Sequence, residues 1–254
     1  MKQTFKVALA ATFVLGTAGI AHADLTYQGQ DGLPLNPTAQ IPERDGVRIQ
    51  GDYFDFGNPG GGRVDDYGVH AAGRLGDNIE INGGVEKFHV PDGSPLDKTG
   101  FALGGKYLFS RESDPVGVRL AAGGGYDQAV LKNAYGFVVA SKSFSGTGGG
   151  RPSITGHLGA RYDHYSADAL GGTSSKASAY VGAEVPLTSA GNFQGVGELQ
   201  SKNNQYADAK FPYSLSLRYR AKAQPWSGSV GIQRQGITGK DGLFAQIGYS
   251  FSTK

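Results

Sequence analysis

Apolar and polar side chains alternate along twelve segments of this sequence, and this period of two constrains the fold more than any other feature. Successive side chains of a β-strand point to opposite faces, so the alternation predicts strands with one apolar and one polar face. Each segment is about ten residues long, whereas strands of globular proteins average about five or six. About ten tilted residues are what a strand needs to cross the hydrocarbon core of a membrane.

The predicted strands cover the chain from residue 47 almost to its end. Their ranges are Val47–Phe56, Asp66–Leu75, Ile79–Val90, Gly100–Phe109, Val116–Tyr126, Ala134–Phe144, Ile154–Tyr165, Lys176–Val185, Asn192–Ser201, Tyr213–Ala221, Trp226–Gln235 and Leu243–Phe251. An even number of strands, with mostly short turns on one side and longer polar loops on the other, is typical of outer-membrane barrels. Two connections, 145–153 and 236–241, depart from that rule, and a miscounted strand near residue 145 would explain the first. The sequence thus predicts an all-β fold, an antiparallel up-and-down transmembrane β-barrel of about twelve strands over residues 46–254.

The alternation alone does not say which face of the strands points inward, because a soluble barrel and a porin-like barrel are inside-out versions of one pattern. Barrel size favours the membrane version, since twelve strands enclose more space than apolar side chains would fill. Aromatic residues near strand ends also favour it, since membrane barrels carry aromatic girdles there. These aromatic residues are Tyr53, Phe54, Phe56, Tyr107, Phe109, Tyr126, Phe144, Tyr162, Tyr165, Tyr213, Tyr219, Trp226, Tyr249 and Phe251. A secreted soluble β-sandwich remains the alternative.

The first 23 residues have the pattern of a secretory signal peptide. Lys2 and Lys6 precede an apolar run, Val7–Ile20, which ends in Ala21-His22-Ala23, an A-x-A cleavage site. Without the two lysines the chain has 22 basic and 22 acidic residues, and this neutrality argues against a nucleic-acid partner. We therefore expect export to the cell outer membrane, with membrane lipid and lipopolysaccharide around the barrel.

The C-terminal strand carries a second localisation signal. Tyr249-Ser250-Phe251 resembles the aromatic-x-aromatic terminus by which outer-membrane barrels are assembled, although Ser252-Thr253-Lys254 follow it. The resemblance implies that the barrel-assembly machinery is a partner of the chain.

Residues 24–45 are rich in proline and precede the first predicted strand. Prolines remove hydrogen-bond donors and disfavour a central strand. The segment is either a periplasmic tail or a plug, because at about 3.3 Å per residue it is long enough to enter a barrel. The plug candidates are Leu33, Pro34, Pro37, Thr38 and Pro42. The run from Gly32 to Ala39 resembles the G-L-x-x-x-P-T-A opening of YjbH-like outer-membrane proteins, and this resemblance implies a link to exopolysaccharide production.

The polar faces of the strands are expected to line the barrel interior. The candidate lining residues are Arg48, Asp52, Arg74, Glu80, Glu86, Lys106, Arg119, Lys142, His157, Arg161, Asp163, Glu184, Glu198, Arg218 and Arg220. If acids and bases line opposed walls, small polar or weakly anionic solutes can diffuse through, and the protein is a porin-like passive channel. If they pair across the interior, the barrel is closed and supports envelope integrity or exopolysaccharide export.

Catalytic and metal-binding patterns are weak in this sequence. His157 and Asp163 share a strand face, but residues six apart lie about 20 Å from each other along a strand. The glycine-rich stretches 59–63 and 146–151 lack the G-x-x-x-x-G-K-[ST] pattern of a phosphate-binding loop. With no Cys and five scattered His, no zinc site is predicted. We expect a protein that is not an enzyme and that uses no metal or cofactor.

Overall fold

A computed structural model describes residues 24–41, 46–57, 63–90, 97–128, 132–144, 153–167, 172–202, 210–220, 224–235 and 240–252. The predicted signal peptide, residues 1–23, lies outside the described residues. Twelve strands are present: β1 (Gly46–Asp55), β2 (Asp65–Leu75), β3 (Ile79–His89), β4 (Lys98–Ser110), β5 (Arg119–Gln128), β6 (Lys132–Phe144), β7 (Ile154–Ala167), β8 (Gly172–Pro186), β9 (Phe193–Gln200), β10 (Tyr213–Arg220), β11 (Trp226–Arg234) and β12 (Asp241–Ser252).

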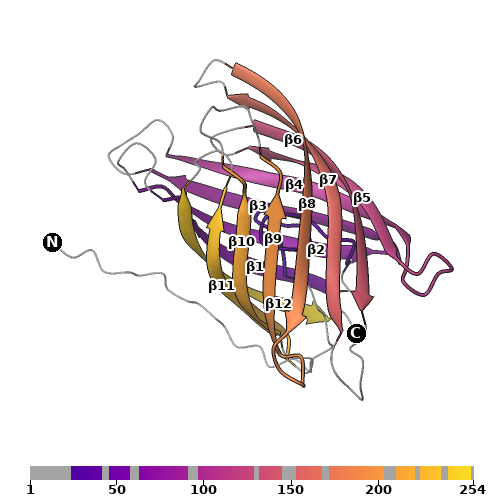
Figure 1. Cartoon of the computed structure of the whole chain (residues 1–254). Coiled ribbons are helices and arrows are strands. Elements are labelled where there is room, and N and C mark those ends of the chain that lie inside the picture. The colour runs from indigo at the N-terminus through magenta and orange to yellow at the C-terminus, as the bar shows by residue number, and fades with distance from the viewer. Residues whose placement is uncertain are drawn as a thin grey trace.

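The strands form one closed antiparallel barrel, as the alternation predicts (Figure 1). Each strand pairs with its neighbours in sequence, and β1 closes the ring by pairing with β12 from Gly46↔Ser252 to Phe54↔Phe244. We call the end of the barrel where β1 starts and β12 finishes the terminal end, and the opposite end the far end. In the described part of the chain no helix has the length and hydropathy needed to cross a membrane.

The strand boundaries agree with the expected ones except around β5 to β8. Strand β5 begins at Arg119 rather than Val116, because residues 114–117 form a turn in which Gly117 has a φ of +65°. Strands β5 to β8 extend farther at the far end than expected, so the connections there shorten to 129–131 and 168–171. The expected alternation of short and long connections is therefore weaker than predicted. Residues 145–152 lie outside the described part, and the flanking strands β6 and β7 pair directly, so no strand was miscounted.

The apolar face of each strand points outward. Ile81, Leu103, Leu158 and Ile247 are all more than half exposed on the outer surface. On β12 the outward-facing odd-numbered residues alternate with Phe244, Gln246, Gly248 and Ser250, which are all buried. Such a surface needs hydrocarbon around it, as in membrane-spanning barrels. The predicted sidedness is confirmed, and the closed ring rules out the sandwich alternative.

Three of the aromatic residues assigned to the girdles point inward instead. Phe54 and Phe56 are 0% and 4% exposed inside the barrel. Tyr165 has the inward parity of Arg161 and Asp163: it lies an even number of residues from them on β7, so its side chain is on the same inward face. The girdle prediction for these three residues is wrong because it used only their distance from a strand end and ignored which face they occupy.

Wall glycines make room for large inward side chains. A Cβ atom at Gly159 would overlap the Tyr180 ring, one at Gly84 would overlap His70, and one at Gly248 would overlap the Arg48 guanidinium. The glycines inside strands therefore determine how bulky groups pack in the barrel interior, which we call the lumen.

The outward face of β12 yields a test of the membrane-facing surface. Ile247→Arg near the middle of β12 is expected to lower the free energy of unfolding by about 2–4 kcal/mol, because it places a charge deep in hydrocarbon. Leu243→Arg, on the same face near the far end, is expected to cost only about 0–1 kcal/mol. Denaturant titration of the barrel in lipid vesicles measures both, and equal small costs would contradict a lipid-facing surface.

Candidate functional site in the barrel lumen

Residues 24–41, which we call the plug segment, occupy the lumen (Figure 1). Leu25, Leu33 and Ala39 have no exposed surface, and neither does Thr38. Pro34 and Pro37 are also buried, while Pro42 lies outside the described residues. The segment is thus enclosed by the strands along its whole described length.

The plug segment has a compact fold of its own. Isolated bridges join Leu25 to Asp31 and Gly32 to Pro37, and the Tyr27 N–H donates to the Pro34 carbonyl at 2.8 Å. Its prolines therefore sit in a folded turn structure rather than in a ladder, which agrees with their lack of donors. The barrel contains a small preformed body, not an extended strand.

The first residue of the plug segment, Asp24, is bound by three arginines and one serine of the wall. One carboxylate oxygen accepts from Arg48 at 2.6 Å and from the Ser227 hydroxyl at 2.5 Å. The other oxygen pairs with Arg218 and lies 3.5 Å from Arg220. Burial by itself would raise the pKa of the Asp24 carboxyl, but the charges of Arg218, Arg220 and Arg48 hold that pKa below its usual range.

Polar side chains of the wall bind the backbone of the plug segment next to Asp24. Gln50 exchanges two hydrogen bonds of 2.9 Å with the backbone of Leu25. The Asp31 N–H donates to Glu80 and its carbonyl accepts from Lys106, both at 2.9 Å, while Lys106 and Glu80 pair at 3.0 Å. Polar and charged wall groups thus replace the backbone partners that a strand would have supplied.

The second half of the plug segment is held in the same way by other strands. The carboxylate of Glu198 accepts from the Leu35 N–H at 2.7 Å and from the Asn36 amide at 2.9 Å. The Tyr180 hydroxyl donates to the Pro37 carbonyl at 2.8 Å. The plug segment is therefore attached to the wall at both ends and in the middle.

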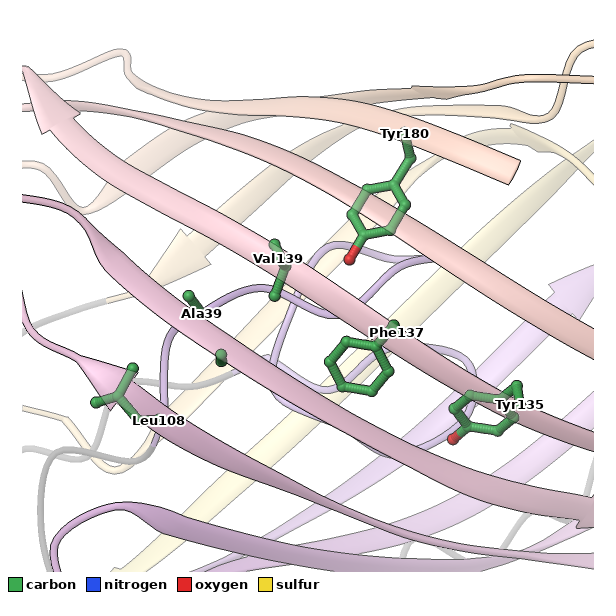
Figure 2. Packing of buried hydrophobic residues seen from close by; sticks show 7 residues of the cluster. Ala39, Leu108, Tyr135, Phe137, Val139 and Tyr180 are labelled. Atoms are coloured by element: carbon green, nitrogen blue, oxygen red, sulfur yellow. The ribbon is translucent and has the colours of Figure 1, made fainter. Parts of the chain in front are cut away.

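Two apolar clusters complete the packing of the plug segment. Ala39 and Ile41 contact a cluster on the wall, and Figure 2 shows Ala39 facing this cluster from the enclosed trace. Its wall members are Leu108, Ala121, Tyr135, Phe137, Val139 and Tyr180. Tyr27 and Leu35 pack against a second cluster that contains Phe54, Phe56, Val64 and Phe244. Sequence reasoning missed these inward apolar groups because it assumed an entirely polar lumen.

The structure places most of the predicted lining residues in the lumen. Those that are buried there are Arg48, Asp52, Glu80, Glu86, Lys106, His157, Arg161, Asp163, Glu184, Glu198 and Arg218. Arg74, Arg119 and Arg220 also have inward parity and are half-buried. Lys142 is a correction: it is exposed and shares the outward parity of Val138 and Phe144, because it was assigned by its charge and not by its face.

Two lumen carboxylates were missed by the sequence analysis. Asp66 and Asp127 are 2% and 6% exposed. Asp66 lies an even number of residues from His70 on β2, and Asp127 an even number from Arg119 on β5, so both face inward. This alternation is the signal that could have found them. With Lys142 removed, the eight basic and six acidic residues expected in the wall become seven and eight. The two signs of charge in the wall are therefore nearly balanced, and charge preference depends on where the charges lie.

His157 of β7 belongs to the contacts of the plug segment. The His157 Nδ1 atom lies 2.8 Å from the Ser141 hydroxyl, whose oxygen accepts the Ala39 N–H at 3.0 Å. Asp163 pairs instead with Arg161 at 2.7 Å. The described residues contain no group of three or more His, Asp or Glu side chains arranged to hold a metal ion.

Comparison with known proteins gives a likeness of fold. No protein family matches the chain, and no curated protein matches it. Among solved structures, the KdgM porin is similar with a TM-score of 0.51 at 12% identity, covering 82% of this chain and 99% of that one. The NanC porin is similar with a TM-score of 0.52 at 12% identity, covering 81% and 99%. These likenesses show that the chain has the fold of a twelve-stranded porin.

The contact between Leu33 and β8 yields a test of the lumen packing. A Cβ atom at Gly182 would overlap the Leu33 side chain, so Gly182→Leu is expected to unseat the plug segment. Hydrogen exchange read by mass spectrometry should then show loss of amide protection over residues 24–41, with strand protection kept. Adding Leu33→Ala should restore part of that protection. A matched control is Gly51→Ala, whose Cβ would meet only Ile247 at 3.9 Å. Unchanged amide protection of residues 24–41 in Gly182→Leu would contradict the placement of Leu33 against Gly182.

Proposed function

We propose that the protein is a porin-like passive channel of the cell outer membrane for small polar or weakly anionic solutes, closed at rest by the plug segment. The observation that carries this proposal is a barrel with an apolar outer surface and a charged lumen, filled by a segment held through side chains. The likeness to two porin structures supports the fold of such a channel.

The proposed location follows from the outer surface and both ends of the sequence. Residues 1–23 serve as the signal peptide, residues 24–45 as the plug, and residues 46–254 as the barrel. The terminal end then faces the periplasm, since outer-membrane barrels with an even number of strands place both termini there. Membrane lipid and lipopolysaccharide surround the exposed apolar band, and the barrel-assembly machinery inserts the chain.

The way in which the plug segment is attached favours a reversible closure. Its backbone is hydrogen-bonded to wall side chains such as Gln50, Glu198 and Tyr180, and among the described residues no strand of the barrel pairs with it in a continuous ladder. Hydrogen bonds exchanged with water contribute only about 0.5–1.5 kcal/mol each, and those to a charged group such as the Glu198 carboxylate about 1.5–3 kcal/mol. A hydrated lumen can therefore replace these contacts one by one, while the barrel ladder stays intact.

Solute preference depends on the position of the lumen charges. Arg48, Arg218 and Arg220 lie together toward the terminal end, whereas Asp66, Glu86 and Asp127 lie toward the far end. A solute that crosses the barrel must pass the arginines, which favour anions over cations at that level.

A closed structural barrel that supports envelope integrity or exopolysaccharide export is the second candidate. The dense pairing of lumen charges favours it, for example Lys106 with Glu80 and Arg161 with Asp163. The two candidates differ in whether ions ever pass through the lumen.

A reversible lock on the plug segment tests the channel. The chain has no cysteine, so Leu33→Cys with Gly182→Cys introduces one bridging pair, where the leucine side chain now touches the glycine. In planar bilayers the oxidised variant is expected to stay closed, and reduction should restore openings at least about tenfold more frequent. The reason is that only the reduced form lets the segment leave the lumen.

Deletion of residues 24–41 gives an independent check. The barrel without residues 24–41 should conduct continuously if it folds. If it does not fold, the cysteine pair decides the question. Leu33→Cys alone controls for the loss of the leucine side chain. Protein that inserts but never conducts in the reduced or deleted form would support the closed structural barrel.

A further inference from the structure

We propose that Arg48, Arg218, Arg220 and Ser227 form a binding site for a carboxylate, that Asp24 is its built-in occupant, and that a carboxylate-bearing solute opens the lumen by displacing Asp24. This inference rests on the proposed channel and names the chemistry that would open it. The four wall residues come from β1, β10 and β11, which lie side by side with β12 in the closed ring.

The geometry around Asp24 matches recognition of a carboxylate. Arg48 and Ser227 bind one of its oxygens at 2.6 and 2.5 Å, and Arg218 and Arg220 are placed on the other. Hydrogen bonds in which both groups are charged are the strong ones, and planar guanidinium groups suit carboxylates. The site thus already binds this functional group, which belongs to the chain itself.

The charge of the site requires an anion when Asp24 leaves. Arg48 and Arg218 are 3% and 0% exposed, and arginine keeps its charge in proteins. Among the described residues the nearest remaining counter-charge is Glu184, which pairs with Arg218 at 3.0 Å. One carboxylate against three guanidinium groups leaves a positive excess that water alone compensates poorly at a buried site. A solute carboxylate can fill the position that Asp24 vacates.

The wall is built so that these arginines can reach into the lumen. Any side chain at Gly248 would overlap the Arg48 guanidinium. Arg218 in addition donates to the Gly32 carbonyl at 3.1 Å, so the group that binds Asp24 also holds the middle of the plug segment. Loss of Asp24 from the site therefore loosens two points of attachment through one arginine.

Thiol labelling in the full chain tests the competition without relying on ion flow. Leu25→Cys places a single thiol next to Asp24, at a position with no exposed surface. Its labelling rate by a charged maleimide is measured while acetate replaces chloride at constant ionic strength, with acetamide as the neutral control of the same shape. Acetate is expected to raise the rate at least about tenfold, as a buried ion pair is lost, and acetamide to leave it unchanged.

Asp24→Asn in the Leu25→Cys background is the second arm. It should label about tenfold faster without acetate and lose the response to acetate, because the built-in carboxylate is gone. Arg220→Gln, at the more exposed edge of the site, should weaken the response to acetate without abolishing it. If the strands of Arg220→Gln lose hydrogen-exchange protection, Ser227→Ala takes its place, because it removes only one hydrogen-bond donor from the site.

The outcomes separate this inference from the proposed function. Labelling that responds to acetate but not to acetamide supports the site, even if the barrel never conducts ions. Labelling that is equal in acetate, acetamide and chloride, in a barrel that conducts once the plug is released, overturns the site and leaves the channel standing. An equal response of Asp24→Asn and the parent to acetate also overturns it.

Discussion

Every backbone N–H and C=O in hydrocarbon must find a partner within the protein, and this constraint determines the rest of the structure. It is met by pairing β1 with β12 from Gly46 to Phe54, which closes the ring. Closure fixes the parity of all twelve strands, so apolar groups such as Leu103 and Ile247 face out while Arg218 and Glu184 face in. The charged lumen is a direct consequence of the apolar outer surface.

A ring of twelve strands encloses more space than its own inward side chains fill, and the plug segment occupies that space. Tyr27 and Leu35 of the segment pack against inward aromatic groups, and its backbone is bound by side chains such as Glu198 and Gln50. The attachment depends on individual polar contacts and on the Asp24 ion pairs rather than on a ladder. The same arrangement can therefore close the lumen and still release it.

The strand count and sidedness could be predicted from the sequence because they depend on local parity, which each strand displays on its own. The choice between a periplasmic tail and a plug for residues 24–41 could not be made, since the contacts that hold them join distant residues, such as Pro37 and Tyr180, which are 143 positions apart. Parity also corrects the errors: Lys142 was assigned to the lumen by its charge, and Phe54 was assigned to a girdle by its position near a strand end. The inward orientation of the carboxylates Asp66 and Asp127 likewise follows from parity. A strict use of parity would have placed all four residues.

A nitroxide scan of β12 in lipid bilayers, one label at a time from residue 243 to residue 251, tests the outward orientation of the apolar strand faces most directly. The chain has no native cysteine, so each label reports a single position. Oxygen, which concentrates in lipid, is expected to reach the odd-numbered positions, and neither oxygen nor a water-soluble reagent is expected to reach the even-numbered positions behind the plug segment. Access of the water-soluble reagent to the odd-numbered positions, or no alternation at all, would contradict the outward orientation on which the lumen, the plug and the channel all depend.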